Sequence, residues 1–263
     1  MLNGIDTQVW DPARAETDPA GGDWVPFTED QLSKRESHRG ALRKRFGLVD
    51  RESQGKGLSP IFGFVGALSP QHGLTALFEV IPKILAAGGQ LAILGDGAEA
   101  YEDTLREIGE AHRGQIGVAL EFNPVLAKRI YAGSDFFLRP SKFDPCGLSQ
   151  MIACRYGSIP IVAHTGGLAD TIRDVDADSQ GNGLTFATPA TMVDKEWHPA
   201  AAKGLAKAVE RALAIHADRP RFDEIRRRAM RCDFSWERSA RASTRTSTPT
   251  RSAARGVAEH YGP

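Results

Sequence analysis

The sequence has few cysteines, no long hydrophobic run and no net charge, and each absence excludes a class of protein. The 263 residues include only three cysteines, without the paired spacing of a zinc site or a disulfide scaffold. No apolar run approaches the roughly 20 residues of a membrane-spanning helix, and residues 1–10 lack the features of a secretory signal. Basic and acidic residues number 33 each, so bulk charge favours neither nucleic acid nor a membrane surface as a partner. We therefore expect a cytoplasmic protein that holds no metal and binds no nucleic acid or membrane.

What the sequence does contain, from residue 59 onward, is a regular alternation of short apolar runs and stretches with helical spacing. The apolar runs predict five strands, at 60–65, 90–94, 116–122, 135–138 and 159–163. The helical spacing predicts helices between them, at 74–87, 99–112, 126–132 and 148–156. Short, continuously apolar strands separated by helices are typical of a parallel sheet that is covered on both faces. We therefore predict an α/β fold with a doubly wound, Rossmann-like parallel sheet, whose ligands bind at the carboxyl ends of its strands.

The chain is expected to have three parts. Residues 1–57 form an entry segment with a helix at 31–46, and residues 58–240 form the α/β domain. Beyond Gly183 the pattern is helical, with extra C-terminal helices predicted at 200–216 and 221–232 and a third beginning near Trp236. Residues 241–263 are rich in Ser, Thr and Arg, and we expect this tail to be disordered.

The predicted helix at 31–46 carries a group of basic residues, which are Lys34, Arg35, Arg39, Arg43, Lys44 and Arg45. Glu36 and two apolar residues, Leu42 and Phe46, interrupt the group. We therefore interpret these basic residues as a solvated helix face rather than a functional basic patch.

Two loops at predicted strand ends carry the residues best suited to chemistry. They span residues 66–73, after the first strand, and residues 139–150, after the fourth. Gly147 precedes a predicted helix, where backbone N–H groups and the helix dipole favour an anion, although a glycine there also fits a simple turn. His72, His164 and Asp144 could form an acid–base set, but each taken singly fits a structural or solvent-exposed role better.

Several short motifs occur in one order along residues 2–240. The most specific is Pro140-Ser141-x-Phe143-x-Pro145-Cys146-Gly147-Leu148-x-Gln150. The others are Asn3-Gly4-Ile5-Asp6-Thr7 with Trp10-Asp11-Pro12, Ser69-Pro70-Gln71-x-Gly73-Leu74, Ala127-x-Arg129-Ile130-Tyr131-Ala132-Gly133-Ser134-Asp135, Thr165-Gly166-Gly167-Leu168-Ala169-Asp170-Thr171 and Phe234-Ser235-Trp236-Glu237. Together these motifs resemble the C-terminal, donor-binding half of the bacterial glycogen (starch) synthases.

The resemblance implies a fold and an activity. Glycogen synthases have the GT-B fold, in which two Rossmann-like domains face each other across a cleft. They transfer glucose from ADP-glucose, which is a substrate rather than a cofactor, to an α-1,4-glucan with retention of configuration and without a metal. By this resemblance the partners are a nucleotide sugar and an α-glucan. The family's N-terminal domain would precede this chain, and we expect the face that it normally covers to be a surface for pairing.

The resemblance also implies a set of site residues. The donor-binding positions are Gly66, Ala67, His72, Phe122, Gly147, Leu148, Ser149, Thr165 and Gly166, and the catalytic position is Asp144. Several of them depart from the family pattern, which has Arg at Ala67, Lys at His72, Glu at Asp144, Gly-Tyr at Glu121-Phe122 and Arg at His164. The two lost cations would neutralise the diphosphate leaving group, and losing one such group typically costs about 10²–10³ in rate.

These departures leave three hypotheses for the chain. In the first, the chain is a weakly active or inactive part of a glycogen synthase, from a truncated or frameshifted gene. In the second, it is a non-catalytic paralogue that binds ADP, a sugar or a glucan, or that pairs with a complete synthase. In the third, it is a remnant that neither catalyses nor binds. All three predict poor or absent catalysis by the chain alone.

Overall fold

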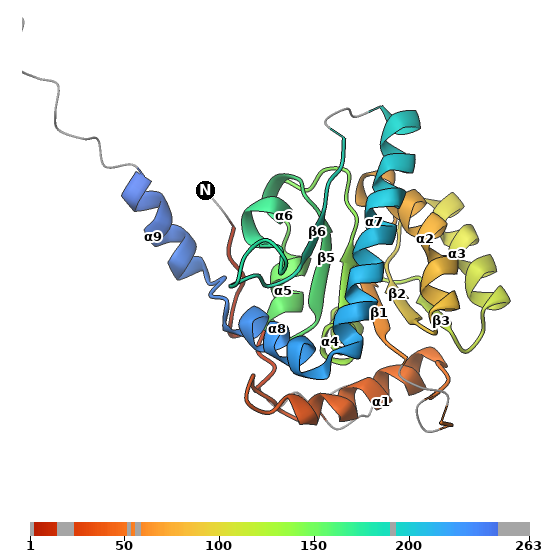
Figure 1. Cartoon of the computed structure of the whole chain (residues 1–263), viewed down its shortest axis with the longest axis horizontal. Helices are drawn as coiled ribbons and strands as arrows, with labels where there is room; N and C mark the ends of the chain where they lie inside the picture. The colour runs from red at the N-terminus through yellow and green to blue at the C-terminus, as the bar shows by residue number, and fades with distance from the viewer. Residues whose placement is uncertain (1–2, 15–23, 52–53, 56–58, 190–192, 247–263) are drawn as a thin grey trace, which may run out of the picture.

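The computed structural model describes residues 3–14, 24–51, 54–55, 59–189 and 193–246. Within this part of the chain, one mixed α/β unit is built around a single sheet (Figure 1). Of the tail expected to be disordered, residues 247–263 lie outside the described residues, and residues 241–246 continue the last helix.

Six parallel strands form the sheet in the order β3-β2-β1-β4-β5-β6. They are β1 (Ile61–Val65), β2 (Gln90–Leu94), β3 (Ile116–Ala119), β4 (Phe136–Arg139), β5 (Ile159–Ala163) and β6 (Leu184–Phe186). This order confirms the predicted doubly wound parallel sheet, since it is the order of dinucleotide-binding folds. The prediction that only helices follow Gly183 is wrong, because β6 pairs with β5 from Leu184 to Phe186. Three residues are too few for an apolar pattern to identify as a strand.

Helices cover both faces of the sheet. Side chains of α2 (Leu74–Ala86), α3 (Glu99–Ala111) and α7 (Asp194–Ala217) pack with Phe62 and Phe64 of β1 in one core cluster. Side chains of α1 (Arg35–Phe46), α4 (Pro124–Gly133) and α5 (Ser149–Arg155) pack with Ile61 of the same strand in a second cluster. Successive residues of a strand point to opposite faces, so β1, which is apolar throughout, serves both cores.

The remaining elements lie at the ends of these layers. They are the short 3₁₀ helices η1 (Leu32–Lys34) and η2 (Pro70–His72), together with α6 (Gly166–Thr171), α8 (Arg219–Arg231) and α9 (Trp236–Thr246). The predicted strand at 116–122 ends early because α4 begins at Pro124, where the Asn123 side chain accepts the Leu126 N–H at 2.9 Å. A helix with this N-cap and a proline at its first position begins sharply.

The interpretation of these basic residues as a solvated face holds for Lys34, Lys44 and Arg45, which are exposed. It is wrong for Arg35, Arg39 and Arg43, which are buried above a carboxylate that lies beneath the helix. Arg39 forms an ion pair with Asp135, the residue just before β4, and Arg35 donates to the Ser134 carbonyl at 2.7 Å. The entry segment is therefore anchored to the amino end of the sheet.

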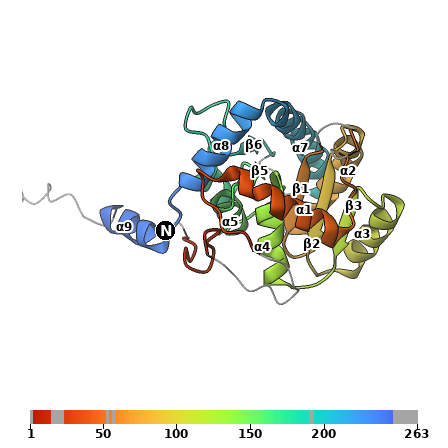
Figure 2. The same cartoon turned by 90° about the horizontal axis from the view of Figure 1, so that it is seen from below.

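The two ends of the described chain meet beside the domain. The Ile5 N–H donates to the Phe234 carbonyl at 2.8 Å, and Gly4 lies against the backbone of Trp236. From that point α9 projects away from the body, as both views show (Figure 1 and Figure 2). None of the helices in the described ranges combines the length and the apolar character that crossing a bilayer requires.

Candidate functional site

The strand order places the change of winding direction between β1 and β4. Chain connections lead from β1 outward through β2 to β3, and from β4 outward through β5 to β6. Folds of this kind bind ligands at the carboxyl ends of the two central strands. The loops at that position are residues 66–73 after β1 and residues 140–148 after β4, which are the two loops that the sequence singles out.

These two loops are in direct contact. Gly73 has a φ of +73° and stands so close to Pro140 that an added Cβ would overlap the Pro140 carbonyl oxygen. The Lys142 N–H donates to the Gln71 carbonyl at 2.8 Å, and the Gln71 side-chain amide donates to the Phe143 carbonyl at 3.0 Å. The loops after β1 and β4 therefore form one connected rim.

The loop after β2 joins the same rim. The Leu68 N–H donates to the Asp96 carbonyl at 2.8 Å, and the Ala98 N–H donates to the Leu68 carbonyl at 2.9 Å. Gly95 lies against the Gly66 carbonyl oxygen with no room for a side chain. The glycines of this turn are thus explained by close backbone approach rather than by a phosphate-binding fingerprint.

Asp144 lies at the centre of the rim and is buried. Its Oδ2 accepts from both Nε and Nη2 of Arg139 at 2.9 Å, and its Oδ1 accepts from the Gly147 N–H at 2.8 Å. The Asp144 carbonyl accepts from the Gly167 N–H at 2.9 Å, which joins the loop after β5 to the loop after β4. Arg139 begins the loop at 139–150 that the sequence singles out, but no role is predicted for it there, although an arginine that ends an apolar strand is a signal that could have identified it.

His72 is half-buried beside this ion pair. Its Nδ1 lies 2.7 Å from the Ala67 carbonyl, to which it can donate. Burial and the nearby Arg139 charge lower the His72 pKa below its usual value, and the Ala67 hydrogen bond and Asp144 offset only part of that effect. His72 is therefore neutral at pH 7 in the unliganded protein, while Ala67, which is exposed, carries no charge at all.

The other predicted donor-binding residues border the same rim. Gly147 and Gly166 both have positive φ, at +48° and +45°, and Gly166 lies against the Asp144 carbonyl. Thr165 is the residue before α6, and Leu148 is exposed. Ser149 is the first residue of α5, and its buried hydroxyl has no hydrogen-bond partner. The fold thus brings the loops after β1, β4 and β5 together.

Phe122 lies in the loop after β3, and its side chain is 83% exposed. In the sheet, β3 lies two strands from β1, which corresponds to about 10 Å at the usual strand spacing. Phe122 therefore follows β3 at the same, carboxyl edge of the sheet as the rim.

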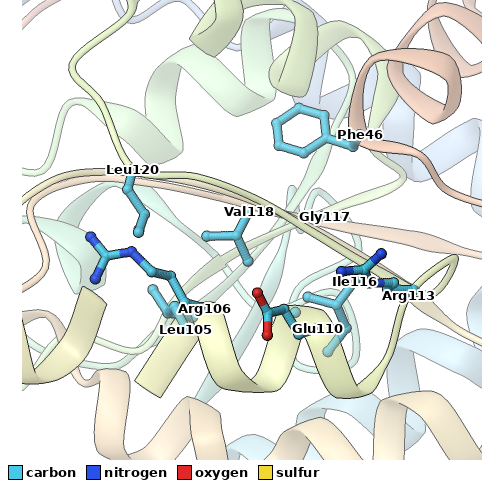
Figure 3. A pocket seen from close by; sticks show the side chains of 10 residues that line it. Phe46, Leu105, Arg106, Glu110, Arg113, Ile116, Gly117, Val118 and Leu120 are labelled. Carbon is cyan, nitrogen blue, oxygen red and sulfur yellow. The ribbon is translucent and has the colours of Figure 1, made fainter. Parts of the chain in front are cut away.

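A hollow of about 280 Å³ opens elsewhere, between α3, β3 and the end of α1 (Figure 3). Its lining consists of Phe46, Leu105, Arg106, Gly109, Glu110, Arg113, Ile116, Gly117, Val118 and Leu120, none of which is a predicted site residue. Within the described ranges, no group of three or more His, Cys, Asp or Glu side chains is arranged to hold a metal ion.

Comparison with known proteins assigns the chain to a family. The model of the family described as "Glycosyl transferases group 1" matches residues 59–214, which include all six strands. This chain belongs to the group 1 glycosyltransferase family.

Named relatives of this chain are glycogen and starch synthases. It is 44% identical over 245 residues to a glycogen synthase of Halorhodospira halophila (strain DSM 244 / SL1). It is 41% identical over 247 residues to a glycogen synthase of Alkalilimnicola ehrlichii (strain ATCC BAA-1101 / DSM 17681 / MLHE-1). The alignments cover 92% and 93% of this chain but 46% and 47% of those relatives, so the chain spans about half their length.

A solved relative supports the same assignment. The catalytic domain of starch synthase IV from Arabidopsis thaliana, solved with ADP and acarbose, is 36% identical and superposes with a TM-score of 0.79. The match covers 93% of this chain and 47% of the starch synthase chain. The predicted resemblance to the glycogen and starch synthases is thereby confirmed, and the described domain has the fold of one Rossmann-like half of a GT-B enzyme.

Proposed function

We propose that this domain binds ADP-glucose as the donor half of a glycogen (starch) synthase, which transfers glucose to an α-1,4-glucan with retention. The observation that carries the proposal is the likeness, over 93% of the chain, to a starch synthase domain solved with ADP and acarbose. The 44% identity to a glycogen synthase supports the same substrate pair.

The connected rim is the proposed position of the donor diphosphate. Gly66, Ala67 and His72 border it from β1, and Thr165 and Gly166 border it from β5. Gly147, Leu148 and Ser149 follow the β4 loop, and Phe122 offers an exposed face on which adenine could stack. Asp144 stays the proposed catalytic position. The proposal includes no metal or other cofactor, since protein cations and N–H groups would balance the diphosphate charge, and it places the protein in the cytoplasm.

A second candidate is a binding module without turnover, and the rim itself favours it. The Asp144 carboxylate is fully engaged by Arg139 and Gly147, whereas His72 is neutral at pH 7 and Ala67 is uncharged. Transfer by the chain alone should therefore be weak or absent. Phe143 and Leu148 are large apolar residues exposed at the rim, at 46% and 44%. We propose this face as the surface that pairs with an N-terminal glycosyltransferase domain.

Calorimetric titration with ADP tests the donor site. We expect a dissociation constant below about 1 mM, equivalent to about 4 kcal/mol. Glu210→Gln, on the exposed surface of α7, is a matched control that should bind ADP as the wild type does. No heat from a sample that is folded by circular dichroism would refute donor binding.

Transfer from radiolabelled ADP-glucose to glycogen, measured with an N-terminal glycogen synthase domain added, then separates the two candidates. Label in the precipitated glucan supports the synthase. Binding of ADP without label, at enzyme concentrations that would reveal one turnover per hour, supports the binding module.

A further inference from the structure

The rim needs a positive charge if it is to hold a diphosphate, and the residues after β1 do not supply one. Ala67 is uncharged, and His72 is half-buried and donates to the Ala67 carbonyl. Lys142 forms an ion pair with Asp194 at the start of α7. Arg139, from the neighbouring strand, is the cation whose guanidinium reaches the β1 loop.

The position of the guanidinium follows from two contacts. Asp144 Oδ2 lies 2.9 Å from Nε and 2.9 Å from Nη2 of Arg139, so it occupies that edge of the guanidinium. Nη1 lies on the other side, against Gly66, where an added Cβ would stand 2.5 Å from it. Glycine at position 66 therefore leaves the space that the guanidinium fills, one residue from Ala67.

The guanidinium is also held in advance of any ligand. The Arg139 side chain is only 10% exposed, and the carboxylate fixes the plane of its fork. An arginine held in this way loses little conformational entropy when it forms further charge-assisted hydrogen bonds. Arg139 is the last residue of β4 and its guanidinium approaches Gly66 after β1, so it lies at the carboxyl edge between these strands, where this class of fold binds phosphate groups.

We propose that Arg139 is the residue that binds the diphosphate of a nucleoside-diphosphate ligand, in place of a cation at position 67. The inference rests on the proposed donor function and adds a specific binding residue to it. Asp144 then has a second role as the positioning residue that orients Arg139. Any other nucleoside diphosphate would be recognised through the same contact.

The test replaces the ion pair without leaving a buried charge. In Arg139→Met/Asp144→Asn we expect ADP affinity to fall about tenfold to a hundredfold, the usual worth of a hydrogen bond to a charged group. Adding Ala67→Arg to the double variant should restore affinity, because it returns a cation to the β1 loop.

Gly66→Ala provides an independent measurement on a protein with its ion pair intact. The φ of Gly66 is not positive, so alanine fits the backbone, but its Cβ would displace Nη1. We expect weaker ADP binding, with the urea midpoint measured alongside to show that the variant is folded.

The outcomes separate this inference from the donor function. A wild-type chain that does not bind ADP overturns both. A wild-type chain that binds ADP, with Arg139→Met/Asp144→Asn binding equally well, overturns only the role of Arg139. If the double variant does not fold, wild-type affinity in Gly66→Ala overturns it instead.

Discussion

Replacing the buried carboxylate of Asp135 should strongly lower the free energy of unfolding. It is 1% exposed and sits where α1, α8 and the start of β4 meet. Arg39 forms an ion pair with it, Arg226 Nη2 lies 3.4 Å from its Oδ1, and the Ile61 N–H donates to its Oδ2 at 2.8 Å. We predict that Asp135→Asn destabilises the fold strongly, because it removes the buried counter-charge of two buried guanidinium groups and leaves them with the more exposed carboxylates of Glu36 and Asp223.

The magnitude follows from the kind of pair that is broken. Removing one partner of a buried ion pair costs about 3–5 kcal/mol, whereas an exposed pair contributes about 0–1 kcal/mol. Asparagine keeps an oxygen that can accept the Ile61 N–H, so we expect the lower end, about 3 kcal/mol. For a domain of this size that corresponds to a fall in melting temperature of roughly 6–12 °C.

Urea denaturation followed by circular dichroism measures the effect. Glu210→Gln is the matched control, because it also removes a carboxylate from an ion pair, with Lys83, but on the surface. It should change the free energy of unfolding by less than about 1 kcal/mol. A midpoint for Asp135→Asn no lower than that of Glu210→Gln would refute the reasoning.

The pH dependence gives a second check with a definite sign. Burial alone raises the pKa of Asp135, but the charges of Arg39 and His216 and the Ile61 N–H outweigh it, so the pKa is lowered on folding. A lowered pKa contributes stability that is fully present above the unfolded value of about 3.9 and is lost as the pH falls through the folded value. The difference in stability between wild type and Asp135→Asn should therefore shrink below about pH 4, where the Asp135 carboxylate takes up a proton.

Three further predictions concern the rim. Gly73→Ala should lower the free energy of unfolding by at least about 1–3 kcal/mol, because the φ of +73° at Gly73 and the contact of Gly73 with Pro140 exclude a Cβ. An unchanged urea midpoint would contradict the contact between these two residues. Phe122→Ala should weaken ADP binding about tenfold without affecting stability, since a stacked base is worth about 1–3 kcal/mol and the ring is exposed; calorimetry and denaturation measure the two effects. Binding of ADP-glucose, whose diphosphate does not titrate near neutrality, should strengthen as the pH falls from 8 to 6, because a bound anion favours protonated His72. His72→Asn should abolish that pH dependence. An equal pH dependence in both proteins would exclude His72 as a group that contacts the diphosphate.

Sequence alone was enough for the architecture of the sheet. The runs at 90–94 and 159–163 are strands with the predicted bounds, because a strand buried on both faces is marked by its own residues. Because helices connect successive strands, the strands are expected to pair in parallel. Parallel pairing brings their carboxyl ends to one edge of the sheet, where ligands bind. β6 escaped prediction because its identity as a strand depends on pairing with β5 rather than on its three residues.

Only the tertiary structure decided where the charges go. The sequence pattern predicts that Arg39 faces solvent on a basic helix. In the structure it is buried and forms an ion pair with Asp135, which lies far along the chain. Likewise the pair of Arg139 and Asp144, and its approach to Gly66, depend on β4 lying beside β1 in the sheet. Hydrophobic pattern is a local property that a short window of sequence records, whereas the partner of a buried charge is set by the packing of distant segments.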